Sequence, residues 1–168
     1  MSILDWGPIG RTRRNHALEH ATLSVLAERT PNLRLGGYSD DRGFWLVGNV
    51  STEAVLEAIQ TALARLEAGE RSLAIHPNCG TNFAATGMLA GTMAWLGMMG
   101  VGRGWRSRLE RWPIIVSLVT LAMIFAQPLG PWLQERITTR AALDGLQVVE
   151  IRRQMHGELP VHRVLTLG

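Results

Sequence analysis

The chain contains no lysine, so all 17 of its positively charged residues are arginines. It has a single cysteine among 168 residues, which excludes an internal disulfide framework. The arginines are scattered, without a basic stripe or a nucleic-acid motif, so the net charge of +3 does not indicate a nucleic-acid partner. Much of this charge lies beside apolar segments, which favours a membrane surface. The first residues also lack the basic region, apolar stretch and cleavage site of a signal peptide.

Two stretches without charged residues are long enough to cross a membrane. They cover residues 82–102 and 112–133. Each has about the 20 residues that a hydrocarbon core of ~30 Å requires. Trp112 and Trp132 stand near the ends of the second stretch, where interfacial aromatic residues belong. A soluble part of this size cannot enclose two such segments. We therefore expect a two-span transmembrane hairpin in the cell membrane, with the lipid bilayer as a partner.

The membrane orientation stays open at this point. The basic link of residues 103–111 favours a cytoplasmic position for the link, which would place the soluble parts outside. The free thiol favours a reducing compartment for the soluble parts instead. On the first span, Gly87 and Gly91 form a G-x-x-x-G pair, which favours close helix packing and a homo-oligomer.

The remaining residues predict a small α+β domain. Before the spans we expect an apolar arm, a helix, two extended segments, a second helix and a short strand, over residues 1–10, 12–29, 33–38, 44–50, 51–68 and 72–75. After the spans we expect a helix and two strands, over residues 134–145, 146–152 and 161–167. Since two spans return the chain to its starting side, these last strands can join the first sheet. The predicted fold is a helix-covered antiparallel or mixed sheet, with domains at 1–81, 82–133 and 134–168.

The first helix carries His16, Glu19 and His20 in the pattern H-x-x-E-H. These positions share one helix face, so the two imidazoles can bind one metal ion. The carboxylate between them can then accept a proton from metal-bound water. The pattern alone fits a solvated polar face equally well, so a third ligand is needed to decide.

Cys79 is the candidate third ligand. It follows His76, Pro77 and Asn78 in a turn, whereas a free cysteine usually lies in a core. A site of two histidines and this cysteine leaves a fourth position for water, as catalytic zinc requires. His76 is an alternative third ligand or a neighbour of the site. Nitrogen and sulfur ligands suit zinc first and ferrous iron second.

The other histidines receive a simpler interpretation. His162 falls on the last predicted strand, and His156 lies in the connection before it. Both are candidate metal ligands by residue type, but we expect them to face solvent instead.

The segments His16–His20 and Asn78–Thr81 resemble the metal site of S-ribosylhomocysteinase. In that family a helical H-x-x-E-H supplies two ligands and a cysteine in a glycine-containing turn supplies the third. Its α+β fold is related to that of the pitrilysin-like peptidases, which also use H-x-x-E-H. The resemblance implies that His16, His20 and Cys79 bind the metal and that Glu19 is the general base. The soluble part as a whole looks like an uncharacterised bacterial membrane-protein family.

The chain also departs from both enzyme families. S-ribosylhomocysteinase uses another cysteine as an acid/base, which is missing here and argues against thioether cleavage. The pitrilysin-like peptidases use a downstream glutamate ligand, and Glu53, Glu57 and Glu67 come too early in the chain to match it. The membrane hairpin belongs to neither family.

We therefore expect a membrane-anchored metal-dependent hydrolase, with a peptidase as one form of it. Its substrate would be a membrane protein, a lipid-linked molecule or a peptide. Two alternatives remain: a metal-binding or regulatory membrane protein without catalysis, and a structural adaptor. Glu19 separates catalysis from metal binding, and metal analysis separates both from the adaptor.

Overall fold

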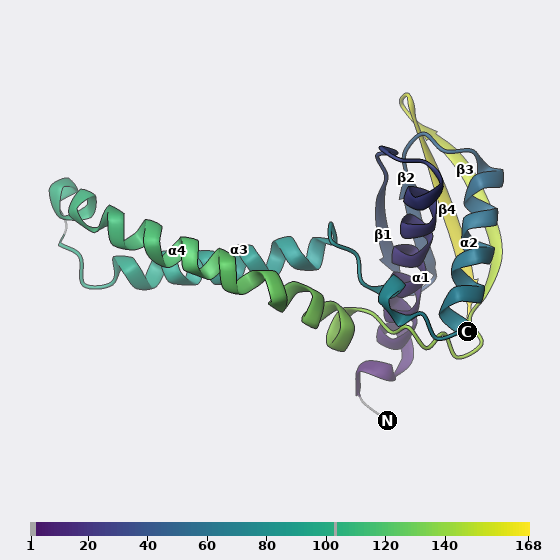
Figure 1. The fold of residues 1–168 in the computed structure, drawn as a ribbon, viewed down its shortest axis with the longest axis horizontal. Coiled ribbons are helices and arrows are strands. Elements are labelled where there is room, and N and C mark those ends of the chain that lie inside the picture. Colours follow the sequence, from purple (N-terminus) through teal and green to yellow (C-terminus); the bar gives the residue numbers. More distant parts are fainter. Residues whose placement is uncertain (1–2, 103) are drawn as a thin grey trace. The chain divides into compact units, whose positions relative to one another are not determined.

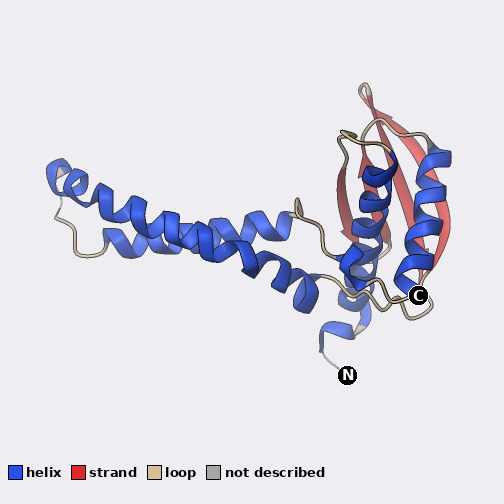
Figure 2. Cartoon of the chain, viewed as in Figure 1, coloured by secondary structure: helices blue, strands red, loops and turns tan. Residues whose placement is uncertain are grey.

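The computed structural model describes residues 3–102 and 104–168, and within them the chain forms four α-helices and four strands (Figures 1 and 2). The chain divides into two compact units. The first, hereafter the sheet unit, contains the described residues up to His76 together with Gln134–Gly168. The second, the helical unit, is Pro77–Leu133. The mixed α+β class expected from the sequence is therefore confirmed.

One antiparallel sheet forms the sheet unit, in the strand order β1-β2-β4-β3. Its strands are β1 (Gly36–Asp40), β2 (Gly43–Val47), β3 (Gln147–His156) and β4 (Leu159–Leu167). The C-terminal strand β4 lies between β2 and β3, so the last residues of the chain complete the sheet. Gly43 has φ +146°, and a Cβ there would overlap the carbonyl oxygen of Val164, so only glycine fits this turn.

Helices α1 (Gly7–Arg29) and α2 (Thr52–Glu67) cover one face of the sheet (Figure 1). Helix α1 begins before the predicted residue 12 because Pro8 occupies its first turn, where no N–H is needed. The apolar arm predicted over residues 1–10 is therefore wrong for the residues that the structure describes. Residues Ile3–Asp5 form a 3-10 turn, and α1 takes up the rest. Helix α2 begins at the predicted place because Ser51 accepts the N–H of Ala54.

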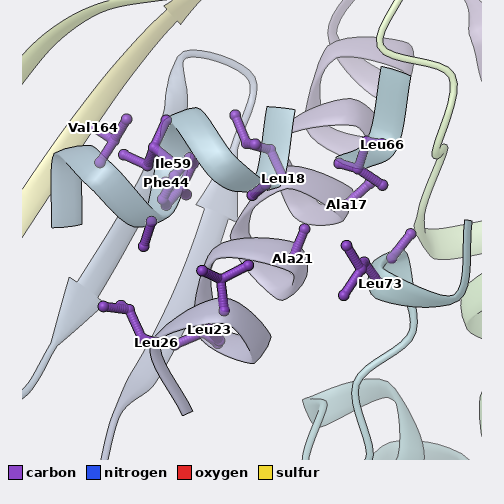
Figure 3. Close-up of a cluster of buried hydrophobic side chains, with 14 of the residues drawn as sticks. Ala17, Leu18, Ala21, Leu23, Leu26, Phe44, Ile59, Leu66, Leu73 and Val164 are labelled. Atoms are coloured by element: carbon purple, nitrogen blue, oxygen red, sulfur yellow. The ribbon is translucent and has the colours of Figure 1, made fainter. Parts of the chain in front are cut away.

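The core lies between these two helices and the sheet (Figure 3). Leu18 of α1 and Ile59 of α2 meet Phe44 and Val164 from the strands, and none of these side chains is more than 1% exposed. Phe44 lies opposite Val164 in the antiparallel register, so both side chains point to the helix-covered face.

The same register corrects the prediction for His162. Strand residues two apart share a face, so His162 points with Val164 toward the helices and is fully buried. Its ring Nε2 lies 3.2 Å from the hydroxyl of Thr52. His156 is exposed, as expected.

Two predicted elements differ in the structure. The strand expected over 72–75 is a 3-10 helix, η2 (Arg71–Ala74). Leu73 and Ala74 are adjacent and both buried, which a strand with one buried face does not allow. The helix expected over 134–145 is a π-helical turn, η3 (Gln134–Thr138). It ends there because the N–H of Arg140 donates to the carbonyl of Arg13 instead of continuing the helix.

The helical unit consists of α3 (Gly80–Met98) and α4 (Trp105–Leu133), which run antiparallel and pack on one another (Figure 1). Gly97 permits a close approach, because a Cβ there would lie 3.0 Å from Ile115. Gly87 and Gly91 lie elsewhere on α3, where an added Cβ would meet no atom of the described chain within 4 Å. The G-x-x-x-G pair is therefore not part of the α3–α4 contact.

Among the described residues, one continuous helix is long and apolar enough to cross a membrane, namely Trp105–Thr138, which is α4 together with η3. Only 22% of its most apolar window is buried, whereas a core helix of a soluble protein would be mostly buried. The predicted two-span hairpin is thus supported for one helix only. Helix α3 does not reach the hydropathy of a span over its length, since glycine, threonine and Asn82 interrupt its apolar residues.

Candidate metal centre

Helix α1 presents the predicted histidines from a fixed position on the sheet. Asn15, which is fully buried, donates a hydrogen bond of 2.8 Å to the carbonyl of Asp40 on β1. Its side-chain oxygen accepts one of 2.7 Å from Thr166 on β4. These bonds hold the first turns of α1 against two strands and so set the direction of the next residue, His16.

Hydrogen bonds to backbone carbonyls set the tautomer of both histidines. The Nδ1 of His16 lies 3.0 Å from the carbonyl oxygen of Thr138, and the Nδ1 of His20 lies 2.8 Å from that of Ala74. A carbonyl oxygen only accepts, so Nδ1 carries the proton and donates in each ring. In a neutral imidazole this places the lone pair on Nε2. Metal-binding histidines are commonly oriented in the same way.

The two rings lie one helical turn apart and close together. The ring centroids of His16 and His20 are 4.2 Å apart, and those of His20 and His76 are 5.6 Å apart. Burial first, and then the neighbouring His20, lowers the pKa of His76 below its ordinary value. A lowered pKa favours the neutral imidazole, which is the form that binds metals. The environment of His76 therefore suits a metal ligand or a neighbour of the site.

Gln134 holds the chain at His76. Its side chain is fully buried, accepts the N–H of His76 at 2.8 Å and donates to the carbonyl of His76 at 3.1 Å. The side-chain amide of Gln134 thus bonds to both backbone groups of His76, as a neighbouring β-strand would. It fixes the point from which the chain runs to Cys79.

Glu19 is buried, with 3% of its surface exposed. The hydroxyl of Ser39 on β1 donates to its carboxylate. A Cβ on Gly37 would overlap the other carboxylate oxygen, so this close approach requires glycine. Burial raises the pKa of Glu19, and the Ser39 hydrogen bond and the charge of His16 oppose that rise in part. The carboxylate is thus held between α1 and β1, on the side of the helix next to the histidines.

Cys79 lies three residues after His76, a distance that the chain spans in at most about 11 Å. It is the N-cap of α3, and the N–H of Thr81 donates to its sulfur at 3.5 Å. A helix N-terminus favours negative charge, so this position suits a thiolate. One ligand atom from each of His16, His20 and Cys79 lies within 4.8 Å of the other two. This cluster could hold a metal ion.

The donor set fits zinc. Two imidazole nitrogens and one thiolate are common zinc ligands, and three protein ligands leave a fourth position for water. The hydrogen bonds from the Nδ1 atoms of the two histidines to the carbonyls of Thr138 and Ala74 orient the rings, as metal-binding histidines require. Ferrous iron accepts the same donor types, so the identity of the metal stays a prediction.

The sequence pattern missed the residues that hold the cluster in place. Ser39 and Gly37 on β1 contact Glu19, and Gln134 holds His76. Two adjacent glycines inside a predicted strand were a signal, because a strand glycine often marks a close approach of another chain segment. Gln134 follows an apolar stretch, and no local pattern indicates its partner 58 residues away.

Comparison with known proteins finds one family model and a curated relative. A relative is an uncharacterized protein of Picosynechococcus sp., 36% identical over 152 residues, in an alignment covering 79% of this chain and 67% of the relative. No solved structure matches. Neither finding supports the resemblance to S-ribosylhomocysteinase or to the pitrilysin-like peptidases, which stays a prediction. A family model described as a domain of unknown function, DUF6391, matches residues 11–151, and the chain therefore belongs to this family.

Proposed function

We propose that the protein is a membrane-anchored metal-dependent hydrolase that binds zinc through His16, His20 and Cys79. The observation that supports this proposal most directly is the orientation of the two histidine rings. Both Nδ1 atoms donate to carbonyls, so both Nε2 lone pairs are set for a ligand, and the sulfur of Cys79 lies within reach of both. A purely structural histidine pair would not need the same tautomer at both positions.

Glu19 is the proposed general base. It is one residue from His20 on α1, and Ser39 holds its carboxylate against β1, where the missing side chain of Gly37 leaves room for it. Zinc, when bound, makes its water acidic enough to lose a proton near neutral pH. Glu19 would accept that proton and later return it to the leaving group, while Ser39 orients the carboxylate.

The anchor in this proposal consists of both helices of the helical unit. Helix α4 has the length and apolarity of a span. Helix α3 carries no charged residue and packs on α4 at Gly97, so α4 would shield one side of it from lipid. Since Cys79 directly precedes α3, the metal centre would lie at the membrane surface. A membrane protein, a lipid-linked molecule or a peptide at that surface is the substrate class.

A specific contact favours a second function, metal binding without catalysis. The Glu19 carboxylate already accepts a hydrogen bond from Ser39 and contacts Gly37. A carboxylate held in this way ties α1 to β1 and does not have to act on a substrate. The protein would then store, sense or structurally use its metal.

Metal analysis of the purified full chain tests the shared part of both functions. The wild-type protein is expected to retain about one equivalent of zinc per chain, in line with a three-ligand site. His20→Ala and Cys79→Ala should each lose it, because each removes a ligand. His156→Ala is the matched control, since this exposed histidine lies on β3 and should leave the zinc content unchanged. Zinc retained by His20→Ala would refute the centre.

Glu19→Gln then separates the two functions. It keeps the shape and the Ser39 contact but cannot accept a proton, so catalysis predicts full zinc content with loss of complementation in a deletion strain. Metal binding without catalysis predicts full zinc content with normal complementation. Circular dichroism of the variant, compared with Ser39→Ala, verifies that the fold is kept. Complementation at the wild-type level would refute hydrolysis.

A further inference from the structure

The sheet unit contains an arginine-lined cavity that the metal centre does not use. It has a volume of about 720 Å³, and none of its lining residues is His16, Glu19, His20 or His76. Its walls come from the turn before α1, from α1 itself, from η2 with the residue after it, and from η3 with the loop after it. Four arginines line it, namely Arg13, Arg71, Arg136 and Arg140. Asp5 and Glu135 are the acidic residues of the lining, so positive charge exceeds negative charge by two.

The existing ion pairs do not neutralise this cavity. Asp5 binds both Arg13 and Arg140, and Arg140 also binds Asp144 at 2.8 Å. Within the described residues, Arg71 and Arg136 form no ion pair, although both line the cavity. Asp5 and Asp144 thus balance Arg13 and Arg140, and Arg71 and Arg136, opposed only by Glu135, leave the surroundings of the cavity with an excess of one positive charge.

The inner arginines also retain hydrogen-bonding capacity. Arg13 donates to the carbonyls of Arg136 and Thr139, each at 3.0 Å, and so holds the loop after η3 in place. Its Nε, like that of Arg140, is buried and has no hydrogen-bond partner among the described residues. A buried N–H without a partner costs free energy, and an anionic ligand with several acceptor oxygens would satisfy it.

We propose that this cavity binds a phosphate group. Guanidinium groups match phosphate in shape and charge, and several arginines in one concavity are typical of phosphate recognition. The volume falls within the range of small-molecule sites and exceeds what a single chloride or carboxylate needs. Arg13 shapes the wall, and Arg71 and Arg136 supply the charge that meets the ligand.

The position of Arg136 in the chain indicates a phospholipid headgroup as one source of this phosphate. Arg136 belongs to the last turn of the helix Trp105–Thr138, which has the length and apolarity of a span. An arginine at the end of a span is placed at headgroup level. A soluble phosphate compound is the other source, and the two are separated by experiment.

The test uses the full chain in a neutral detergent, freed of metal with a chelator so that the metal centre cannot bind phosphate. Isothermal titration with dihexanoyl phosphatidic acid should show saturable binding, and dihexanoyl phosphatidylcholine should bind at least tenfold more weakly. The double variant Arg71→Gln/Arg136→Gln should weaken phosphatidic acid binding at least tenfold. Arg34→Gln is the matched control, since this exposed arginine lies outside the cavity and should bind as wild type.

Inorganic phosphate identifies the source. If it competes with phosphatidic acid at similar concentration, the phosphate alone is recognised and a soluble compound is the ligand. If it competes only at hundredfold higher concentration, the headgroup of a lipid is the ligand. The proposal would be overturned if the wild-type protein did not bind phosphatidic acid. It would also be overturned if the double variant, like Arg34→Gln, bound phosphatidic acid as tightly as the wild type. Hydrogen exchange at α1 and β2 distinguishes loss of the ligand from loss of the fold.

Discussion

The two units of this protein differ in where they place polar and apolar side chains. All nine buried polar or charged side chains of the described chain lie in the sheet unit, among them Asn15, Glu19, His20 and Gln134. By contrast, 16 of the 27 exposed large apolar side chains lie in the helical unit, which is the shorter of the two. The sheet unit thus encloses a polar network in its interior, and the helical unit presents apolar side chains outward.

This contrast is the one that the proposed membrane anchor requires. A polar network is stable inside a protein only when its members are hydrogen-bonded, and Asn15, His20 and Gln134 each have such partners. A water-exposed helix pair with tryptophan, phenylalanine and methionine on its outside would aggregate. In a bilayer the same surface is stable, because lipid tails are as apolar as the side chains.

Charge on the outside of α4 should produce the largest effect. Phe125 is 68% exposed and lies in the apolar middle of this helix. Phe125→Arg should cost about 3 kcal/mol of insertion free energy, so the variant should be lost from the membrane fraction. Leu56→Arg is the control, because Leu56 is 44% exposed on α2 of the sheet unit and should stay at wild-type level. Release of the wild-type protein by high salt alone would contradict a membrane span.

A larger side chain at Gly97 should produce the second-largest effect, by destabilising the packing of α3 on α4. A side chain at Gly97 meets Ile115 and Leu118, so Gly97→Leu overpacks this contact and should destabilise it by about 1–3 kcal/mol. Gly91→Leu meets nothing within 4 Å and should leave the pair intact. Hydrogen exchange of the α3 amides in detergent measures both. Equal effects of the two variants would show that Gly91 also lies in a helix contact, as the predicted homo-oligomer requires.

The sequence predicted elements whose pattern is local. The burial of Leu18, Ala21 and Val25 follows from helical spacing, and the N-cap at Ser51 follows from residue type. The H-x-x-E-H pattern located three residues of the candidate site because they share one helix face. Such features need only a few neighbouring residues to be recognised.

The parts that failed depend on distant partners. The helix predicted over 134–145 ends early because Arg140 bonds to Arg13, 127 residues before it. His162 is buried because of its register with Leu46, which no local pattern contains. Ser39 and Gln134 belong to the surroundings of the site only through contacts with α1 and with His76. Hydrogen bonds over such separations are set by the fold, so residue spacing does not predict them.

The smallest expected effect concerns one carboxylate at the edge of the sheet. Asp40 on β1 accepts a hydrogen bond of 2.8 Å from Arg163 of β4, and the guanidinium of Arg163 also lies 4.8 Å from the ring of Trp45. Burial alone would raise the pKa of Asp40, but the bonds and charge of Arg163, with the N–H groups of Arg42 and Gly43, outweigh it and lower that pKa below 3.8. The folded state therefore prefers the charged carboxylate.

This preference gives the sign of the pH dependence. A lowered pKa in the folded state means that the unfolded chain binds more protons in acid, so the contribution of Asp40 is complete above its ordinary pKa of 3.8 and is lost as the pH falls through the folded value. Asp40→Asn should cost about 0.5–1 kcal/mol at neutral pH, since solvent partly screens the pair, and nothing in strong acid. Hydrogen exchange of the β1 and β2 amides at several pH values measures this difference. Asp41→Asn is the control, because its pair with Arg11 is 3.8 Å long and exposed on both sides, so its removal should change nothing at any pH. A pH-independent loss in Asp40→Asn would mean that its hydrogen bonds, and not its charge, connect the two strands.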